Sequence, residues 1–216
     1  MPGEIDLVVF DLDGVLARLD RGRRLTLLAE MTGKDPGFLD AAVWASDFER
    51  RAEAGAYPSG GEYLAEFNRR IGATLRRDEW VRARRDAMTV DREVLRIAEA
   101  LRDHCAIAML TNNGALLHET LAEILPAVHR VFGERAHASF QFNARKPERA
   151  VFERLLSRYG VAPSQAAFID DYEEFVDGAR QVGMHGIRFT GAVALRAELE
   201  RLGLGQSSND EVEQRP

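Results

Sequence analysis

The sequence predicts an α/β fold in which helices cover both faces of a doubly wound parallel sheet. Short apolar runs at 5–10, 106–110 and 166–169 are continuous rather than alternating, as expected of parallel strands that are buried on both faces. Residues 138–140 and 186–189 are weaker strand candidates. Strands that alternate with helices along the chain build such a sheet. The amphipathic segments that predict the helices are 92–102, 115–125, 147–159, 173–182 and 192–202.

Composition excludes several classes of protein. With 216 residues, 45% of them hydrophobic, the chain can bury a proper core. Its formal net charge of −6 argues against a general binder of nucleic acid or anionic membranes. Cys105 is the single cysteine, which excludes an intramolecular disulfide and fits a reducing compartment. No apolar run is long enough to cross a bilayer, and the first residues do not read as a signal peptide. We therefore expect a soluble cytoplasmic protein without a nucleic-acid or membrane partner, and the sequence leaves its oligomeric state open.

One interval between strands is too long for a simple crossover. Ninety residues separate Asp13 from His104, whereas a strand–helix–strand unit needs only about 30 residues. The surplus is too long for a bare loop in a compact domain. We predict that residues 17–88 form a small all-helical insert, which can act as a lid. The stretches with helical spacing in it are 25–31, 38–51, 61–71 and 78–88.

Helix-start signals support this division of the chain. Asp35 followed by Pro36 is typical of a helix start, and Ser59 with Glu62 three residues later fits a capping box. The sheet-bearing core then comprises two segments, and a final segment loses all apolar periodicity, which predicts a disordered tail. The core segments are 1–16 and 89–202, and the tail is 203–216.

Polar residues follow the predicted strands at the point where each strand ends. Asp11, Asp13 and Gly14 follow the first strand, Thr111, Asn112 and Asn113 the second, and Asp170 and Asp171 the third, while Lys146 precedes the helix that leads to the third. Each of these alone could be a helix cap or a turn. Because ligands bind beyond the carboxyl ends of the strands in such a sheet, the set together predicts one site.

The predicted site gathers four carboxylates, which require a compensating cation. Two like charges about 4 Å apart cost roughly 4 kcal/mol at an effective dielectric near 20, and their repulsion raises their pKa values. Oxygen ligands without a partnering His or Cys favour Mg²⁺, and the five histidines are not spaced as metal ligands. We therefore expect Mg²⁺ to be held by Asp11, Asp13, Asp170 and Asp171.

A cation beside a lysine and a threonine hydroxyl is typical of a phosphoryl-binding site, because the positive groups offset phosphate charge while hydroxyl and N–H groups hold its oxygens. An aspartate in line with phosphorus can attack it and form an acyl phosphate. A second carboxyl two residues later can protonate the leaving alcohol and then activate water. Asp11 and Asp13 have the spacing for this pair of roles. We expect a small phosphorylated metabolite to be bound by Gly14, Thr111, Asn112, Asn113 and Lys146.

The ordered motifs resemble those of the haloacid dehalogenase-like superfamily of phosphotransferases. The four motifs match at 11–15 (DLDGV), 111–112 (TN), 146–147 (KP) and 168–171 (FIDD), and together they span almost the whole chain. The resemblance implies a Rossmann-like core with a helical cap between the first two motifs, in agreement with the surplus of residues found there.

The resemblance also implies a role for each motif residue. Asp11 would be the nucleophile and a Mg²⁺ ligand, and Asp13 would be the general acid and base and lend its main-chain carbonyl to the metal. Thr111 and the Asn112 amide would hold the phosphoryl oxygens. Lys146 would neutralise the phosphoryl group and orient Asp11.

The fourth motif carries one departure from the family pattern. Asp171 would be its main carboxylate ligand, with Asp170 beside it or reaching the metal through water. The last two motifs are similar to those of the subfamily that contains small sugar-phosphate phosphatases and the N-terminal phosphatase domains of epoxide hydrolases. That subfamily has an Asn four residues after the second Asp, where this chain has Phe175. Asp177 could compensate, although its offset is not the usual one.

The resemblance points to a Mg²⁺-dependent phosphatase that acts on a small phosphomonoester such as a sugar phosphate, and three alternatives stay open. A phosphomutase of the β-phosphoglucomutase type keeps the same four motifs. A haloacid dehalogenase shares the nucleophile but needs neither a metal nor the second Asp of the first motif. A non-catalytic binder of a phosphate ligand would not require the full set of catalytic side chains.

Arginines in the insert are expected at the surface. The run at 76–85 (RRDEWVRARR) interleaves basic and acidic residues, which predicts a solvated helix face. Arg18, Arg21, Arg23 and Arg24 follow the first motif and could reach a distal group of the substrate, but surface charge is the default interpretation.

Overall fold

The computed structural model describes residues 4–205, and its centre is a parallel sheet. Within these residues the sheet has five strands in the order β5-β4-β1-β6-β7, and every neighbouring pair is parallel. The arrangement confirms the predicted α/β class. The strands are β1 (Leu7–Phe10), β4 (Ala106–Thr111), β5 (Ala136–Ala138), β6 (Ala166–Asp170) and β7 (His185–Arg188).

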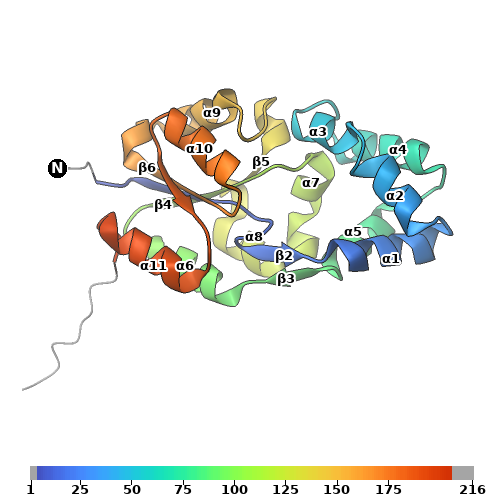
Figure 1. The fold of residues 1–216 in the computed structure, drawn as a ribbon, viewed down its shortest axis with the longest axis horizontal. Coiled ribbons are helices and arrows are strands. Elements are labelled where there is room, and N and C mark those ends of the chain that lie inside the picture. Colours follow the sequence, from blue (N-terminus) through green and yellow to red (C-terminus); the bar gives the residue numbers. More distant parts are fainter. Residues whose placement is uncertain (1–3, 206–216) are drawn as a thin grey trace, which may run out of the picture.

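Helices cover both faces of this sheet. They are α6 (Arg92–Leu101), α7 (Ala115–Ile124), α8 (Pro126–Phe132), α9 (Arg149–Tyr159), α10 (Glu173–Gln181) and α11 (Ala192–Arg201), with short 3₁₀ turns at Gly133–Arg135, Ser139–Phe142 and Pro163–Gln165. Helices α9 and α10 lie on one side of the sheet, and α6, α8 and α11 lie on the other (Figure 1). Alternate residues of β1 point to opposite faces: Val8 and Phe10 belong to one apolar cluster, Leu7 and Val9 to the other.

A second group of helices lies beyond one end of the sheet (Figure 1). Their segment begins and ends in an antiparallel two-stranded ribbon. The ribbon corrects the expectation of an all-helical insert, because backbone pairing between Ala17 and Val90 and between Leu19 and Met88 ties the two connections together. Its strands are β2 (Ala17–Leu19) and β3 (Met88–Val90), and the helices between them, called the cap below, are α1 (Arg21–Thr32), α2 (Pro36–Val43), α3 (Phe48–Glu53), α4 (Gly60–Ile71) and α5 (Arg77–Arg85).

Two helices replace the single helix predicted over residues 38–51. The Ser46 hydroxyl donates to the carbonyls of Ala42 and Val43, at 3.0 and 2.8 Å, and so ends α2. The same oxygen accepts the N–H of Phe48 at 3.2 Å and so begins α3. The apolar spacing continues through this break, which is why periodicity alone did not reveal it.

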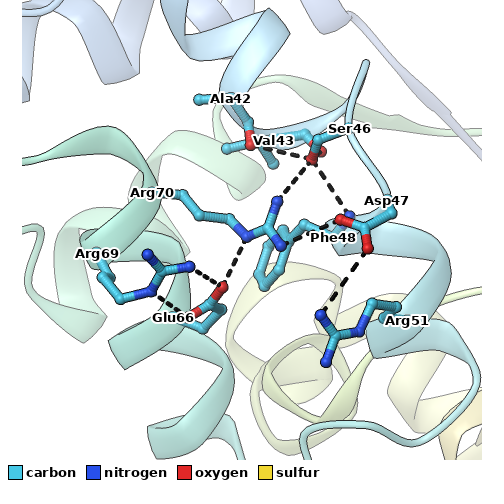
Figure 2. Close-up of polar contacts among 9 residues, drawn as sticks. All are labelled: Ala42, Val43, Ser46, Asp47, Phe48, Arg51, Glu66, Arg69 and Arg70. Carbon is cyan, nitrogen blue, oxygen red and sulfur yellow. Dashed lines mark hydrogen bonds and ion pairs between the residues drawn. The ribbon is translucent and has the colours of Figure 1, made fainter.

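Arg70 of α4 fixes the turn between α2 and α3, as Figure 2 shows. Its guanidinium donates to Glu66 at 2.8 Å, to Ser46 at 3.1 Å and to Asp47 at 3.1 Å. It also lies 5.1 Å from the ring centroid of Phe48. The cap helices are therefore held in one arrangement by polar contacts as well as by apolar packing.

The predicted helix starts in the cap are confirmed. The Asp35 side chain accepts the N–H of Phe38 at 3.0 Å, and Pro36 is the first residue of α2. The Ser59 hydroxyl accepts the N–H of Glu62 at 3.2 Å at the start of α4.

The predicted tail lies largely outside the described residues, which end at 205. After α11, Leu204 is only 8% exposed and packs into the core. Within residues 4–205, none of the helices combines the length and the apolar character that crossing a membrane requires.

Candidate active site

The first and fourth motifs meet where β1 and β6 end. Phe10 lies beside Ile169 in the sheet, and the N–H of Asp11 donates to the Ile169 carbonyl at 2.9 Å. The side chains of Asp11 and Asp170 therefore leave neighbouring strands at the same level. Thr111 is the last residue of β4, on the other side of β1.

Lys146 lies between two of these carboxylates and is fully buried. Its Nζ is 2.8 Å from Asp11 Oδ1 and 2.6 Å from Asp170 Oδ2. Asn112 positions the lysine: its side-chain Nδ2 donates to the Lys146 carbonyl at 3.0 Å, and its Oδ1 accepts the Lys146 N–H at 2.8 Å. The Asn112 side chain thus positions Lys146. Only the main-chain N–H of Asn112 is then left as a donor for a bound anion.

Phe175, the departure from the family pattern, covers the lysine with an apolar surface. The Nζ of Lys146 lies 5.1 Å from the ring centroid of Phe175 and 5.2 Å from that of Phe168, distances at which a cation is attracted by the ring face. Asp177 does not compensate for the missing Asn, because it pairs with Arg180 at 2.8 Å on the surface.

The Asp13 side chain points toward the cap rather than toward Lys146. Arg84 Nη2 of α5 lies 2.9 and 2.7 Å from its two carboxylate oxygens. Asn113 Nδ2 donates to Asp13 Oδ2 at 3.2 Å and to Thr111 Oγ1 at 2.8 Å. Asn113 therefore links the carboxylate after β1 to the hydroxyl at the end of β4.

Three carboxylates could hold a metal ion. Asp11, Asp170 and Asp171 each offer an oxygen within 4.8 Å of the others. Asp11 Oδ1 and Asp171 Oδ1 are both buried: Asp11 Oδ1 has Lys146 Nζ as its neighbour at 2.8 Å, whereas Asp171 Oδ1 has no hydrogen-bond partner. The Asp13 side chain is not part of this cluster, so only its main-chain carbonyl remains as a candidate ligand. Gly14 adjoins the cluster at φ +96°, and a Cβ there would lie 2.4 Å from Asp171 Oδ2. Oxygen-only donors, one of them unpartnered, fit Mg²⁺.

The surroundings of the cluster disfavour the ionised form of its carboxylates. Burial raises the pKa of Asp11 to about 8, where Lys146 opposes the rise and Asp170 adds to it. Burial also raises the pKa of Asp171, with Asp170 contributing. For Lys146, burial opposes the charged form, but Asp11 and Asp170 outweigh it and raise its pKa. A further positive charge at this point would favour the ionised carboxylates.

A cavity of about 300 Å³ lies between the cap and the strand ends. On the side of the sheet its lining includes Asp13, Asn112 and Asn113. On the side of the cap its lining includes Arg24, Trp44, Glu49, Tyr63, Trp80 and Arg84. Glu53 of α3 also lines it and pairs with Arg145 at 2.6 Å, next to the lysine. The cavity thus joins Asp13 to a polar pocket in the cap.

Two arginines of this cavity correct the expectation that cap arginines lie at the surface. Arg24 and Arg84 are 2% and 4% exposed. A signal for both is in the sequence: Arg24 is one helical turn before the buried Leu28, and Arg84 is one turn after the buried Trp80. Each therefore falls on the apolar stripe of its own helix, a placement that composition alone does not reveal.

The family comparison covers most of the chain. Residues 5–183 match the model of haloacid dehalogenase-like hydrolases. The chain is also 28% identical over 191 residues to a phosphatase of Mycobacterium tuberculosis, an alignment that covers 83% of this chain and 85% of that protein.

Solved structures share the fold at low sequence identity. A HAD family enzyme of Bacteroides thetaiotaomicron, in complex with magnesium and inorganic phosphate, is 21% identical with a TM-score of 0.71, over 85% of this chain and 93% of that one. A HAD-like family hydrolase of Porphyromonas gingivalis is 22% identical with a TM-score of 0.76, over 92% and 99%. The L-2-haloacid dehalogenase of Xanthobacter autotrophicus is 18% identical with a TM-score of 0.61, over 91% and 83%.

Proposed function

Since the chain belongs to the haloacid dehalogenase-like hydrolase family, we propose that it is a Mg²⁺-dependent phosphatase that hydrolyses a small phosphomonoester through an aspartyl-phosphate intermediate. One observation carries the proposal: the buried Asp11 lies 2.8 Å from Lys146 Nζ, while Asp13, two residues later, faces the cavity. The relative from M. tuberculosis is named a phosphatase, and the structure from B. thetaiotaomicron holds magnesium and phosphate. Both agree with this assignment.

In the first half-reaction a carboxylate oxygen of Asp11 forms a bond to phosphorus while the bond between phosphorus and the ester oxygen breaks. Asp13 gives its proton to the departing oxygen, so the alcohol leaves neutral. Lys146 offsets the negative charge of the phosphoryl group during the transfer. Asn113 keeps Thr111 and Asp13 in fixed relation through its two hydrogen bonds.

In the second half-reaction water attacks phosphorus. The ionised Asp13 takes a proton from that water, and the bond between phosphorus and the Asp11 oxygen breaks. Inorganic phosphate leaves, and both aspartates return to their starting states. Arg84, within 2.9 Å of both Asp13 oxygens, holds the Asp13 side chain in place between the two steps.

Mg²⁺, when bound, would supply positive charge for the phosphoryl oxygens. Asp171 has a buried oxygen without a hydrogen-bond partner, and Asp11 contacts Lys146 through Oδ1, which leaves Oδ2 as its second oxygen. Both oxygens of Asp170 are engaged, Oδ2 by Lys146 Nζ at 2.6 Å and Oδ1 by the Tyr172 N–H at 2.8 Å. We therefore assign direct ligation to Asp11, Asp171 and the main-chain carbonyl of Asp13, and a supporting role to Asp170.

The test is phosphate release from p-nitrophenyl phosphate with Mg²⁺. Asp11→Asn should lower turnover by about a thousandfold or more while the protein stays folded, because no nucleophile remains. Asp103→Asn serves as the matched control, because Asp103 is exposed and precedes the amino end of β4, whereas the site lies at the carboxyl ends of the strands. This variant should have the turnover of the wild type. EDTA should abolish turnover and Mg²⁺ should restore it.

Two results would overturn this assignment. Near-wild-type turnover of Asp11→Asn would show that Asp11 is not the nucleophile. Full activity in EDTA would show that the reaction does not need the metal. Product analysis separates the phosphomutase alternative, since isomerised ester without released phosphate would identify a mutase. Release of halide from a 2-haloacid, without phosphatase activity, would identify a dehalogenase.

The single cysteine, Cys105, is a free thiol. A phosphatase of this kind acts on phosphorylated metabolites, and together with the absence of a disulfide this supports a place in the cytoplasm.

A further inference from the structure

Four buried N–H groups around the cavity have no hydrogen-bond acceptor. They are Arg24 Nε, Arg24 Nη2, Trp80 Nε1 and Arg84 Nε, and all three side chains line the cavity. In the acidic cluster, Asp171 Oδ1 is a further buried atom without a partner. An unpartnered acceptor thus lies in the acidic cluster, and unpartnered donors lie in the cap.

Arg24 is the centre of the donor group. Its guanidinium carbon lies 5.0 Å from the ring centroid of Trp44 and 5.0 Å from that of Trp80. Within residues 4–205 no carboxylate oxygen lies within 4.0 Å of it, whereas Arg21, one turn earlier, pairs with Asp40 at 2.5 Å. Burial lowers the pKa of Arg24 to about 10, and Arg84 adds to that effect, so the guanidinium remains charged near neutral pH. Arg24 is therefore a buried cation without a counter-charge.

Glu49, the other ionisable group of the pocket without an ion pair, does not supply that counter-charge. Its Oε1 accepts the hydroxyl of Tyr63 at 2.6 Å. Burial raises the pKa of Glu49, while the hydrogen bond from Tyr63 and the charges of Arg24 and Arg84 oppose the rise. Since no carboxylate of the described residues pairs with Arg24, its donors are left for an acceptor on a bound molecule.

We propose that the substrate is a phosphomonoester whose leaving group carries a second anionic group, a carboxylate or a phosphate, and that Arg24 binds that group. The proposal rests on the proposed function, because the same cavity reaches Asp13. The guanidinium carries its donors in one plane, and this geometry matches the oxygens of a carboxylate or phosphate. Trp80 Nε1 adds a further donor. A volume of about 300 Å³ is at the low end for ligand pockets, which limits the leaving group to a short chain.

The test compares three substrates that differ in one terminal group. They are propyl phosphate, the phosphate ester of 3-hydroxypropanoate and the bisphosphate of 1,3-propanediol. We expect kcat/KM for at least one doubly anionic ester to exceed that for propyl phosphate by about 10- to 100-fold, the range for a hydrogen-bonded charge pair. A preference for the carboxylate assigns the pocket to carboxylates, and a preference for the bisphosphate assigns it to phosphates. Equal values for all three esters would overturn the proposal.

Substitutions of Arg24 test whether this residue causes the preference for a doubly anionic ester. Arg24→Met should lower kcat/KM for the preferred doubly anionic ester by about 10- to 100-fold and change that for propyl phosphate less than about threefold. Arg24→Lys should recover part of the loss, because it keeps the charge without the planar edge. Arg69→Met, which removes an exposed arginine of the same cap, should leave both substrates unchanged. A loss of equal size on propyl phosphate and on the doubly anionic ester in Arg24→Met would contradict the assignment.

A second measurement uses the wild-type protein alone and does not depend on turnover. Propylphosphonate and 3-phosphonopropanoate are non-hydrolysable analogues of two of the esters that lack the ester oxygen and differ from each other only in the terminal group. Calorimetry with Mg²⁺ should give a Kd at least about tenfold lower for 3-phosphonopropanoate, and equal affinities would overturn the proposal even if Arg24→Met fails to fold. If the wild type releases no phosphate from any ester but still prefers 3-phosphonopropanoate, the proposed function fails and the anion pocket stands.

Discussion

Removing the positive charge of Lys146 should destabilise the protein strongly. In Lys146→Met the apolar stem is kept, but Asp11 and Asp170 lose the ammonium that lies 2.8 and 2.6 Å from them. All three side chains are at most 6% exposed, so water cannot replace the lost partner. Breaking a buried pair in this way costs about 3–5 kcal/mol, a large part of the roughly 5–15 kcal/mol that keeps a domain folded.

Urea unfolding followed by circular dichroism measures this loss. With a slope of about 2 kcal/mol per molar urea, the midpoint should fall by roughly 1.5–2.5 M. The measurement is made in EDTA, so that no bound cation replaces the lysine. The double variant Lys146→Met with Asp170→Asn should recover part of the shift, because it also removes one of the two carboxylates. Non-additivity of this kind identifies a direct interaction.

Lys34, the other of the two lysines of the chain, gives the matched control. It is only partly buried, on the cap, and Lys34→Met should change stability by no more than about 0.5 kcal/mol. A midpoint shift for Lys146→Met no larger than that of Lys34→Met would refute the reasoning, since the buried carboxylates would then not depend on the lysine.

Three further predictions concern the acidic cluster and the cap. Gly14→Ala should abolish most activity, because the new Cβ would lie 2.4 Å from Asp171 Oδ2. Gly33→Ala, also at positive φ but with nothing within 4 Å of the new Cβ, should affect stability alone. Phosphate release and urea midpoints of the two variants test this difference. Mg²⁺ should raise the melting temperature of the wild type and raise that of Asp171→Asn much less, since binding to the native state stabilises it; equal shifts in a thermal scan would contradict ligation by Asp171. Burial raises the pKa of Glu53 from 4.5 to about 7, against the opposing charge of Arg145. Between these two pH values the folded protein keeps a proton that the unfolded chain releases. The free energy of unfolding should therefore fall by roughly 3 kcal/mol as the pH rises from about 4.5 to 7. Glu53→Gln should lose this part of the slope, and urea midpoints at pH 5 and pH 8 that change in parallel for both proteins would speak against it.

The core of the fold was predictable because burial on both faces leaves a simple pattern. The runs that became β1, β4 and β6 are continuous apolar stretches, which are typical of parallel strands buried on both faces. The strand predicted over 138–140 instead lies at Ala136–Ala138, because Ser139 already begins a 3₁₀ turn. Helix α8 was not predicted: Pro126 lies two residues after the end of α7 and is the first residue of a separate short helix.

The cap side of the candidate site was less accessible to sequence reasoning. The motif residues follow strands, and the carboxyl ends of neighbouring parallel strands lie at the same edge of a sheet. The proximity of Asp11 and Asp170 could therefore be predicted without knowledge of side-chain packing. Arg24 and Arg84 depend on how α1, α4 and α5 pack on one another, and periodicity does not give the rotation between helices. A charged residue on an apolar stripe is the one local sign of such a position, and both arginines carry it.

The position of Arg84 links the cap to Asp13, the proposed general acid and base. Helix α5 carries both Trp80, whose ring centroid lies 5.0 Å from the Arg24 guanidinium, and Arg84, whose Nη2 lies within 2.9 Å of both Asp13 oxygens. A change in α5 therefore alters recognition of the leaving group and the environment of Asp13 together. Arg24 lies on α1 and has no contact of this kind with Asp13, so a change there should alter recognition alone. Substrate preference and proton transfer can thus be separated at Arg24 but not at Arg84.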